Sequence, residues 1–243
     1  MDSLRKTAFV AGALYLITFV SSIAALPLLG PVLNNPDYIV SSGADTSELF
    51  GALFDMINAV ACIGTAVVLF RVVRRQHEAA ALGFVASRLM EAAIILIGVV
   101  SLLAVVTLRQ DLAGVAGTDA DSLMTVGTAL VVVRDWTFLL GPNFVAAINA
   151  LLLGSLMYRS GLVPRAIPLM GLVGAPLLLA SSIATMFGFN EQLSPLSAIL
   201  VAPIFFWELS LGIYLVVKGF KPSPITAGMV AAGTPRADSH IPA

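Results

Sequence analysis

The chain has 243 residues, of which 58% are hydrophobic and only 11% are charged, and its mean hydropathy is +0.97. Soluble domains are about 45–50% apolar and about 25% charged, so a water-soluble fold of this length would leave much apolar surface in water. The net charge of −1 argues against nucleic acid as a partner. Cys62 is the single cysteine, which excludes an intrachain disulfide and a cysteine metal site. Composition therefore predicts a protein surrounded by lipid, with membrane lipids as its partners.

Six stretches are long and apolar enough to cross a membrane as helices, because a span needs about 20 residues. The predicted spans are residues 7–29, 48–70, 80–107, 136–158, 167–189 and 195–217. Pro, Gly, Asn and Asp are frequent between them and favour turns. The first stretch has the basic start of a secretory signal, but its apolar run exceeds the about 7–15 residues of such signals. The predicted fold class is all-α, a polytopic transmembrane bundle over residues 1–220.

Residues 123–135 form a moderately apolar helical stretch that ends in Arg134 and Asp135. One straight helix over residues 121–158 would be about 57 Å long, whereas the bilayer core is about 30 Å thick. Gly141-Pro142 offers a break between the two parts. We therefore predict an interfacial helix around residues 123–135, with Arg134 and Asp135 near the membrane surface beside Trp136.

Lysine and arginine residues concentrate on one side of this six-span arrangement. That side carries Arg5, Lys6, Arg71, Arg74, Arg75, Arg159, Arg165, Lys218, Lys221 and Arg236. The other side carries Arg109 and Arg134, and Arg88 lies inside. Cytoplasmic loops are enriched in basic residues, so we expect a cell (cytoplasmic) membrane protein with both termini inside and residues 221–243 as a disordered cytoplasmic tail. The alternative is a seventh span over residues 123–140, which would reverse the orientation of everything after it.

The third stretch carries Arg88 and Glu91 one helical turn apart. A rise of about 1.5 Å per residue places Arg88 about 12 Å and Glu91 about 16 Å from the start of the helix. Glu91 is therefore expected near the middle of a bilayer core about 30 Å thick. Ionisable residues at such depth face protein, a partner charge or trapped water.

Polar and small residues line one face of the second stretch, since they recur every three or four positions: Glu48, Gly51, Asp55, Asn58, Cys62 and Thr65. This face predicts either a hydrogen-bonded seam between helices or the wall of a cavity. Asp55 and Asn58, with Glu208 of the last stretch, are expected at depths similar to that of Glu91.

We predict one ligand-binding or proton-handling site from Arg88, Glu91, Glu208, Asp55 and Asn58. A single base facing three acids leaves an excess of negative charge, which is costly in low dielectric. A protonated carboxylate, a bound cation or a water-filled cleft is therefore expected.

Two functions fit this pattern. The first is a small-molecule or proton-linked carrier or binding protein, and the second is a structural or accessory membrane protein whose buried charges only fix helix packing. Catalysis is not expected, because the sequence has no HExxH, GxSxG, Walker A or GxGxxG motif. His77 and His240 lie in a loop and in the tail, so we expect no metal site, and no motif calls for a cofactor.

Four stretches, RKTAFVAGALYLITFVSSI, NPDYIVSSGADT, GFVASRLMEAA and LMYRSGLVPRAIPLMGLVG, resemble the bacterial membrane family called domain of unknown function 4386. The similarity spans residues 5–221, and its most specific parts are SRLMEA and YRSGLVPR. The resemblance implies a polytopic bacterial inner-membrane protein and implies no activity. It also implies that Arg88 and Glu91, which lie in SRLMEA, are features of the family.

Overall fold

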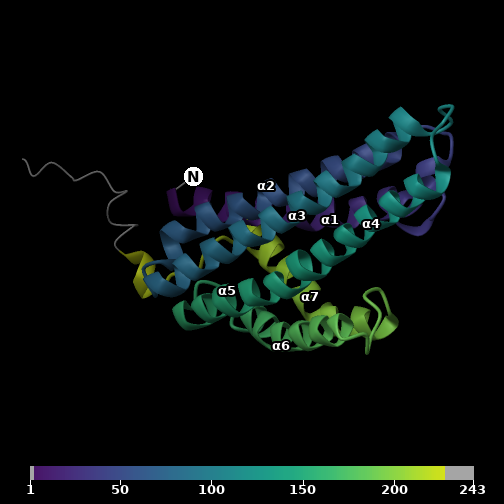
Figure 1. Ribbon diagram of the computed structural model, residues 1–243. Helices are drawn as coiled ribbons and strands as arrows, with labels where there is room; N and C mark the ends of the chain where they lie inside the picture. Colours follow the sequence, from purple (N-terminus) through teal and green to yellow (C-terminus); the bar gives the residue numbers. More distant parts are fainter. Residues whose placement is uncertain (1–2, 228–243) are drawn as a thin grey trace, which may run out of the picture.

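The computed structural model describes residues 3–227, and helices are the only regular secondary structure over that range (Figure 1). In chain order these are α1 (Ser3–Asn34), the 3-10 helix η1 (Tyr38–Val40), α2 (Thr46–Val73), α3 (Glu78–Leu112), α4 (Ala120–Phe138), the π-helix η2 (Leu139–Val145), α5 (Ala146–Ser160), α6 (Ala166–Met186), α7 (Pro195–Val217) and the 3-10 helix η3 (Pro224–Thr226). Six helical stretches have the length and composition to cross a membrane. The predicted all-α polytopic bundle is confirmed.

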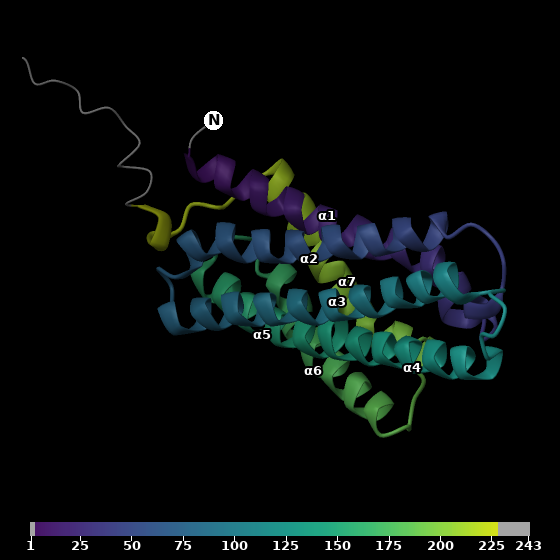
Figure 2. The same cartoon turned by 45° about the horizontal axis from the view of Figure 1, so that its top comes forward.

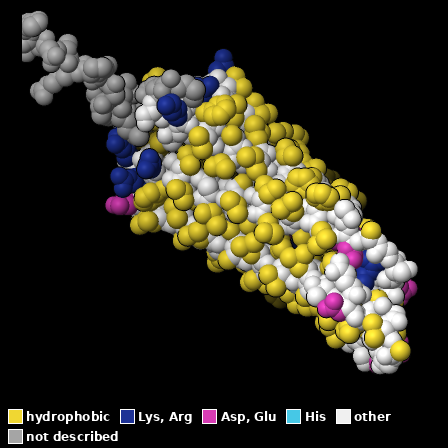
Figure 3. Space-filling view, turned by 90° about the horizontal axis from the view of Figure 1, so that it is seen from above, with side chains coloured by type: hydrophobic (Ala, Val, Ile, Leu, Met, Phe, Trp, Pro, Cys, Tyr) yellow, Lys and Arg dark blue, Asp and Glu magenta, His cyan; other side chains and the backbone are white. Residues whose placement is uncertain are grey.

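The spans form a closed ring. Each span packs against the next one along the chain, and α7 returns to pack against α1. The largest apolar core, which includes Phe84, Leu153 and Trp207, lies in one half of the bundle. A second apolar cluster around Leu29 and Leu102 lies in the other half. Apolar side chains also cover the outside of the bundle (Figure 3), as expected for a surface in contact with lipid.

Helix α1 begins, and helix α7 ends, at the same end of the molecule (Figures 1 and 2). The Arg5 guanidinium donates hydrogen bonds to the carbonyl oxygens of Leu215 at 2.9 Å and Val216 at 2.7 Å. Lysine and arginine side chains gather here (Figure 3). We call this the basic end, defined by Arg5, Lys6, Arg71, Arg74, Arg75, Arg159, Arg165, Lys218 and Lys221, and the opposite end the far end.

The prediction of a separate interfacial helix over residues 123–135 is wrong. Residues 120–160 are one continuous helical stretch of 41 residues, and the Ser101 hydroxyl of α3 donates to the Leu130 carbonyl oxygen of α4 at 2.6 Å. Pro142 bends this stretch without ending it, because the wider turns of η2 accommodate the missing N–H. The Asn143 amide donates to the Phe138 carbonyl oxygen at 3.0 Å within this segment. The alternative seventh span is also absent from residues 3–227.

The helical stretch over residues 120–160 can be long because the helices of the bundle differ in length. Helices α1 and α3 have 32 and 35 residues, whereas α6 and α7 have 21 and 23. Since all of them reach the basic end, α1–α4 project beyond α6 and α7 at the far end (Figure 1). Residues 121–158 were predicted as two parts on the assumption that a spanning helix is no longer than the bilayer core. Helices that project beyond the core do not meet this limit.

The beginning of the predicted disordered tail is packed against the basic end. The backbone N–H of Lys221 donates to the Leu162 carbonyl oxygen at 2.8 Å, and the Ser223 hydroxyl donates to the Ser160 carbonyl oxygen at 2.6 Å. Thr226 is only 2% exposed. Residues 221–227 thus pack onto the bundle. The rest of the predicted disordered tail, residues 228–243, lies outside the described range.

Helices α1 and α7 approach each other at two glycines. A Cβ atom on Gly12 would lie 2.7 Å from the carbonyl oxygen of Gly212 and 2.8 Å from the backbone nitrogen of Val216. Real Cβ atoms essentially never approach backbone atoms so closely. Small residues at such crossings let membrane helices pack backbone to backbone.

The far end is held by Asp45, which precedes α2. Its carboxylate accepts hydrogen bonds from Tyr38 Oη at 2.6 Å and Gln110 Nε2 at 2.9 Å, and it pairs with Arg109. Burial alone would raise the pKa of Asp45, but hydrogen bonds from Tyr38, Gln110 and Arg109 outweigh it and lower the pKa below its usual value. The charged carboxylate therefore ties the loop after α1 to the end of α3.

We predict that Gly12→Ala destabilises the protein, because the added methyl group meets backbone atoms of α7 that have no rotamer to change. Overpacking of this kind costs about 1–3 kcal/mol, which a lower thermal unfolding midpoint in detergent would reveal. Gly83→Ala is the matched control, since its Cβ would lie 3.6 Å from Leu152, an ordinary contact distance. Equal midpoints for the two variants would contradict the close approach of α1 and α7.

We predict a pH dependence of stability that originates from Asp45. A carboxyl group whose pKa is lowered by folding stabilises the fold above its unfolded pKa of about 4, and this contribution disappears as the pH falls through the folded pKa. Asp45→Asn should therefore cost about 1.5–3 kcal/mol at pH 7, the value of hydrogen bonds to a charged group, and should flatten the acid limb of the stability profile measured in detergent. Asp37→Asn, an exposed position in the same loop, should leave that limb unchanged; an unchanged limb in Asp45→Asn would argue against the effect.

Candidate functional site

Arg88 of α3 lies inside the ring and is only 2% exposed. Its guanidinium pairs with Glu91 Oε2 at 3.0 Å and with Glu208 Oε1 of α7 at 3.2 Å. Arg88 Nη2 also donates to the Tyr15 hydroxyl of α1 at 3.1 Å, and Nη1 donates to Cys62 Sγ of α2 at 3.4 Å. The structure therefore brings together three of the five predicted site residues.

Two further polar residues complete this group. The Asn149 amide of α5 donates to Glu91 Oε2 at 2.6 Å, and the Ser87 hydroxyl donates to Asn149 Oδ1. Sequence reasoning did not assign Asn149 or Tyr15 to the site; the available signal was a lone amide within an apolar span and a tyrosine on a face of small residues. We call the group the Arg88 centre, defined as Arg88, Glu91, Glu208, Tyr15, Cys62, Asn149 and Ser87.

The Arg88 centre is nearly closed. The side chains of Arg88 and Glu91 are 3% and 6% exposed, whereas that of Glu208 is 24% exposed. One guanidinium faces two carboxylates, so the centre carries an excess negative charge if both acids are ionised. Such a charge is costly in low dielectric, and Glu208 is the member through which a proton or water would reach it.

The prediction that Asp55 belongs to the Arg88 layer is wrong. Asp55 Oδ2 accepts a hydrogen bond from Arg134 Nη2 at 3.1 Å, and both residues are buried. Arg134 was expected near the membrane surface, but α4 packs along α3 and directs it inward. Gly98 of α3 makes this possible, because a Cβ there would lie 3.0 Å from Arg134 Cδ. Two separate charged groups, Arg88 with Glu91 and Glu208 and Arg134 with Asp55, thus replace the single layer of one base and three acids.

Asn58 lies between the two charged groups along α2. Cys62 Sγ donates to Asn58 Oδ1 at 3.8 Å and is itself a partner of Arg88. On its other side Asn58 lines a small cavity with Asp55 and Arg134. The predicted polar face of α2 is therefore a seam near Cys62 and a cavity wall near Asp55, so both predicted roles occur on the same helix.

The cavity beside the Arg134 pair has a volume of about 30 Å³, enough for one or two water molecules. It adjoins a second cavity of about 250 Å³, and Leu26 and Phe138 line both. The second cavity lies between α1, η2, α6 and α7. Apolar side chains such as Leu178 and Val201 form one half of its lining, and uncharged polar side chains form the other half, among them Asn143, Ser181, Ser182, Thr185, Gln192 and Ser197. We call it the hydroxyl cavity. The Gln192 amide nitrogen is buried there without a hydrogen-bond partner among the described residues.

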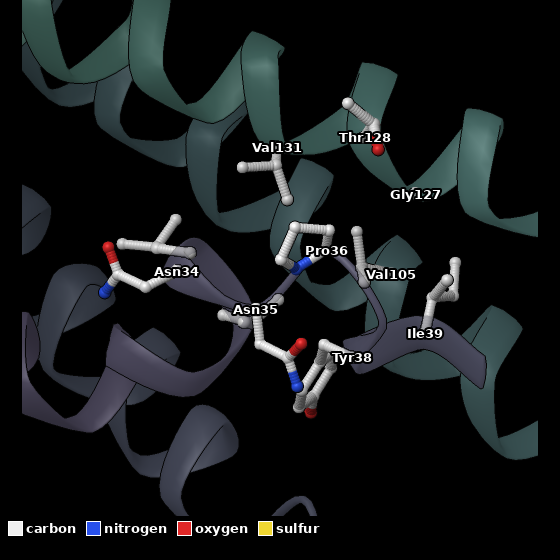
Figure 4. A pocket seen from close by; sticks show the side chains of 11 residues that line it. Asn34, Asn35, Pro36, Tyr38, Ile39, Val105, Gly127, Thr128 and Val131 are labelled. Carbon is white, nitrogen blue, oxygen red and sulfur yellow. The ribbon is translucent and has the colours of Figure 1, made fainter. Parts of the chain in front are cut away.

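Another cavity, of about 140 Å³, lies at the far end between the end of α1, η1, α3 and α4 (Figure 4). The side chains of Pro36, Val105 and Val131 surround it, and its lining is uncharged and mostly apolar. None of the predicted site residues lines it. This cavity is therefore a gap between helix ends and is separate from both charged groups.

Within residues 3–227, no group of three or more His, Cys, Asp or Glu residues is arranged to hold a metal ion. What the site offers chemically is ion pairing, hydrogen bonding and proton exchange by carboxylates.

Comparison with known proteins adds one positive result. No curated protein and no solved structure matches this chain. A family profile described as "Domain of unknown function (DUF4386)" matches residues 10–219. This range includes the spans, both charged groups and the SRLMEA and YRSGLVPR stretches. The chain therefore belongs to the DUF4386 family and is a multi-pass membrane protein.

Proposed function

We propose that this protein binds or carries a small polar molecule, or a proton, across part of the bacterial cytoplasmic membrane. The observation that carries the proposal is that the Arg134–Asp55 ion pair lines a small cavity next to the hydroxyl cavity. A buried ion pair that only fixed packing would be enclosed by side chains, whereas this one borders space for water. Intramembrane charges that line such space are typical of substrate and proton pathways.

The orientation that we propose places the basic end in the cytoplasm, because basic residues are enriched there. The hydroxyl cavity then lies toward the outer side, where α6 ends and α7 begins. The loop between these two short helices carries Gln192. A solute would enter from outside and lie among the uncharged hydroxyl and amide groups. One or two water molecules in the adjoining small cavity would link it to Arg134, Asp55 and Asn58.

The lining indicates the kind of solute. A cation and an anion lie side by side, and Asn58 adds an amide that both donates and accepts hydrogen bonds. Together they complement a neutral polar or zwitterionic molecule better than an ion of either sign. The volume of about 250 Å³ is slightly below the range of about 300–1,000 Å³ for drug-sized ligands, which favours a small solute.

The Arg88 centre favours the second candidate function, a structural one. Arg88 and Glu91 are nearly sealed from solvent, and the cavities described above are lined by other residues. The centre connects α1, α2, α3, α5 and α7 through a single guanidinium and its partners. Buried ion networks of this kind can specify one arrangement of helices. In this proposal Arg88 holds the ring together and Arg134 interacts with the solute through water.

We predict that water-soluble thiol reagents reach the hydroxyl cavity but not the Arg88 centre. Thr185→Cys in the hydroxyl cavity should react with a charged methanethiosulfonate added to the outside of proteoliposomes, since the reactive thiolate forms only where water is present. A solute that occupies this cavity should slow the reaction. Labelling rates measured by mass spectrometry, with a panel of small zwitterions and polyols as competitors, test both expectations.

Three positions provide the controls for this labelling. Native Cys62 is 1% exposed and should stay unmodified. Val60→Cys on the same helix, at a position 68% exposed on the outside of the bundle, should face lipid and react slowly, and Ser87→Cys in the Arg88 centre should also react slowly. Equal rates at Thr185→Cys and Val60→Cys, or no protection by any solute, would contradict the binding function.

We predict that Arg88→Gln destabilises the protein by about 3–5 kcal/mol, because it leaves buried carboxylates without their cation. Glu208→Gln should be far milder, since it leaves the Arg88–Glu91 pair neutral and removes the excess charge. Arg159→Gln, an exposed position at the basic end, is the matched control, and chemical or thermal unfolding in detergent is the measurement. A pH-dependent binding or flux signal that disappears in Glu91→Gln while stability is retained would instead assign solute or proton handling to the Arg88 centre.

A further inference from the structure

A groove of about 460 Å³ opens on the outside of the bundle between α1 and α2 at the basic end. Lys6 of α1 and Arg71 of α2 both line it, together with Val10 and Val67. It lies on the opposite side of these helices from the buried Arg88 centre, whose α1 and α2 members are Tyr15 and Cys62. The groove is therefore independent of the proposed solute site.

The two bases that line the groove have free donors. Lys6 and Arg71 are exposed, and within residues 3–227 neither forms an ion pair with an acid. Other bases of the same end are engaged: Arg5 donates to carbonyl oxygens at the end of α7, and Arg74 lies over the Phe70 ring at 5.7 Å. Lys6 and Arg71 thus present two positive charges from different helices to one space.

The deeper part of the same groove is apolar. Helix α1 runs away from the basic end, so Val10 lies one turn deeper in the bundle than Lys6. Helix α2 runs toward the basic end, so Val67 lies one turn deeper than Arg71. Val10 and Val67 are 44% and 59% exposed. The groove therefore offers cations at its mouth and an apolar wall below them, on the surface that faces lipid.

We propose that this groove binds an anionic phospholipid of the leaflet at the basic end. Lys6 and Arg71 pair with the phosphate of the head group, and an acyl chain lies along Val10 and Val67. Two bases flanking a groove between membrane helices suit an anionic head group, and Arg71 has the planar donor geometry that matches phosphate. The apolar wall below the charges distinguishes this site from one for free phosphate, because a phosphate ion has no apolar part that could contact Val10 and Val67.

The test uses the full-length protein purified in detergent and mixed with phosphatidylglycerol or phosphatidylcholine, with bound lipids counted by native mass spectrometry. The protein should retain phosphatidylglycerol in preference to phosphatidylcholine. Lys6→Gln combined with Arg71→Gln should weaken phosphatidylglycerol binding about 30-fold, because each base near an anionic lipid contributes about 1 kcal/mol. Arg159→Gln combined with Lys218→Gln is the matched control, since it removes the same charge from exposed positions of the same end and should leave binding unchanged.

Several outcomes would overturn the proposal. Equal losses in the two double variants would show that general charge at this end, and not the groove, attracts the lipid. Competition by inorganic phosphate would identify a site for free phosphate instead. Circular dichroism melts establish that both variants are folded. As a second readout, Val10→Trp should fill the apolar wall and displace the lipid while both bases remain, and undiminished binding in that variant would contradict an acyl chain lying there.

Discussion

The pairing of Arg88 with two carboxylates is the interaction on which the rest of the bundle depends. Its guanidinium contacts α1, α2 and α7, and through Glu91 it reaches α5. A charge in this apolar interior is tolerated only where its partners meet it, since an unpaired buried charge costs several kcal/mol. The ring of helices therefore has one arrangement in which Arg88 is satisfied. The close contact between Gly12 and Gly212 is part of the same arrangement.

The ion pair between Arg134 and Asp55 has surroundings that differ from those of Arg88, because it lies beside a cavity between helices. The π-helix over Leu139–Val145 changes the register of the long fourth span. As a result Arg134 on one side of it and Asn149 on the other both face α3, the first beside Gly98 and the second against Glu91. Arg88 and Glu91 are enclosed and Glu208 is the partly exposed member of their centre, whereas the Arg134 pair borders a cavity. The neighbouring cavity, and not the charge, distinguishes the proposed solute site from the Arg88 centre.

The two ends of the molecule differ in the lengths of their helices and in their charge. At the far end the short α6 and α7 leave the hydroxyl cavity beside the longer α1 and the η2 turn. At the basic end all spans finish together, the chain after α7 packs back onto the loop before α6, and unpaired bases remain on the outside. The proposed solute route at one end and the proposed lipid site at the other both rest on this difference in helix length and charge.

The sequence alone determined the membrane class, favoured six spans over seven, and predicted that Arg88, Glu91 and Glu208 lie in one site. Apolar length and the cost of buried charge act locally, and they can be read from spacing along single helices. The partner of Asp55 could not be predicted, because it depends on how α4 lies against α3, and a straight helix of bilayer length gave no reason to place Arg134 inside. Asn149 and Tyr15 were visible as polar residues in apolar spans, but only the folded ring decides which face of each helix turns toward Arg88. The packing of helices, which is set by contacts between distant parts of the chain, decided which charges are sealed and which are open to water.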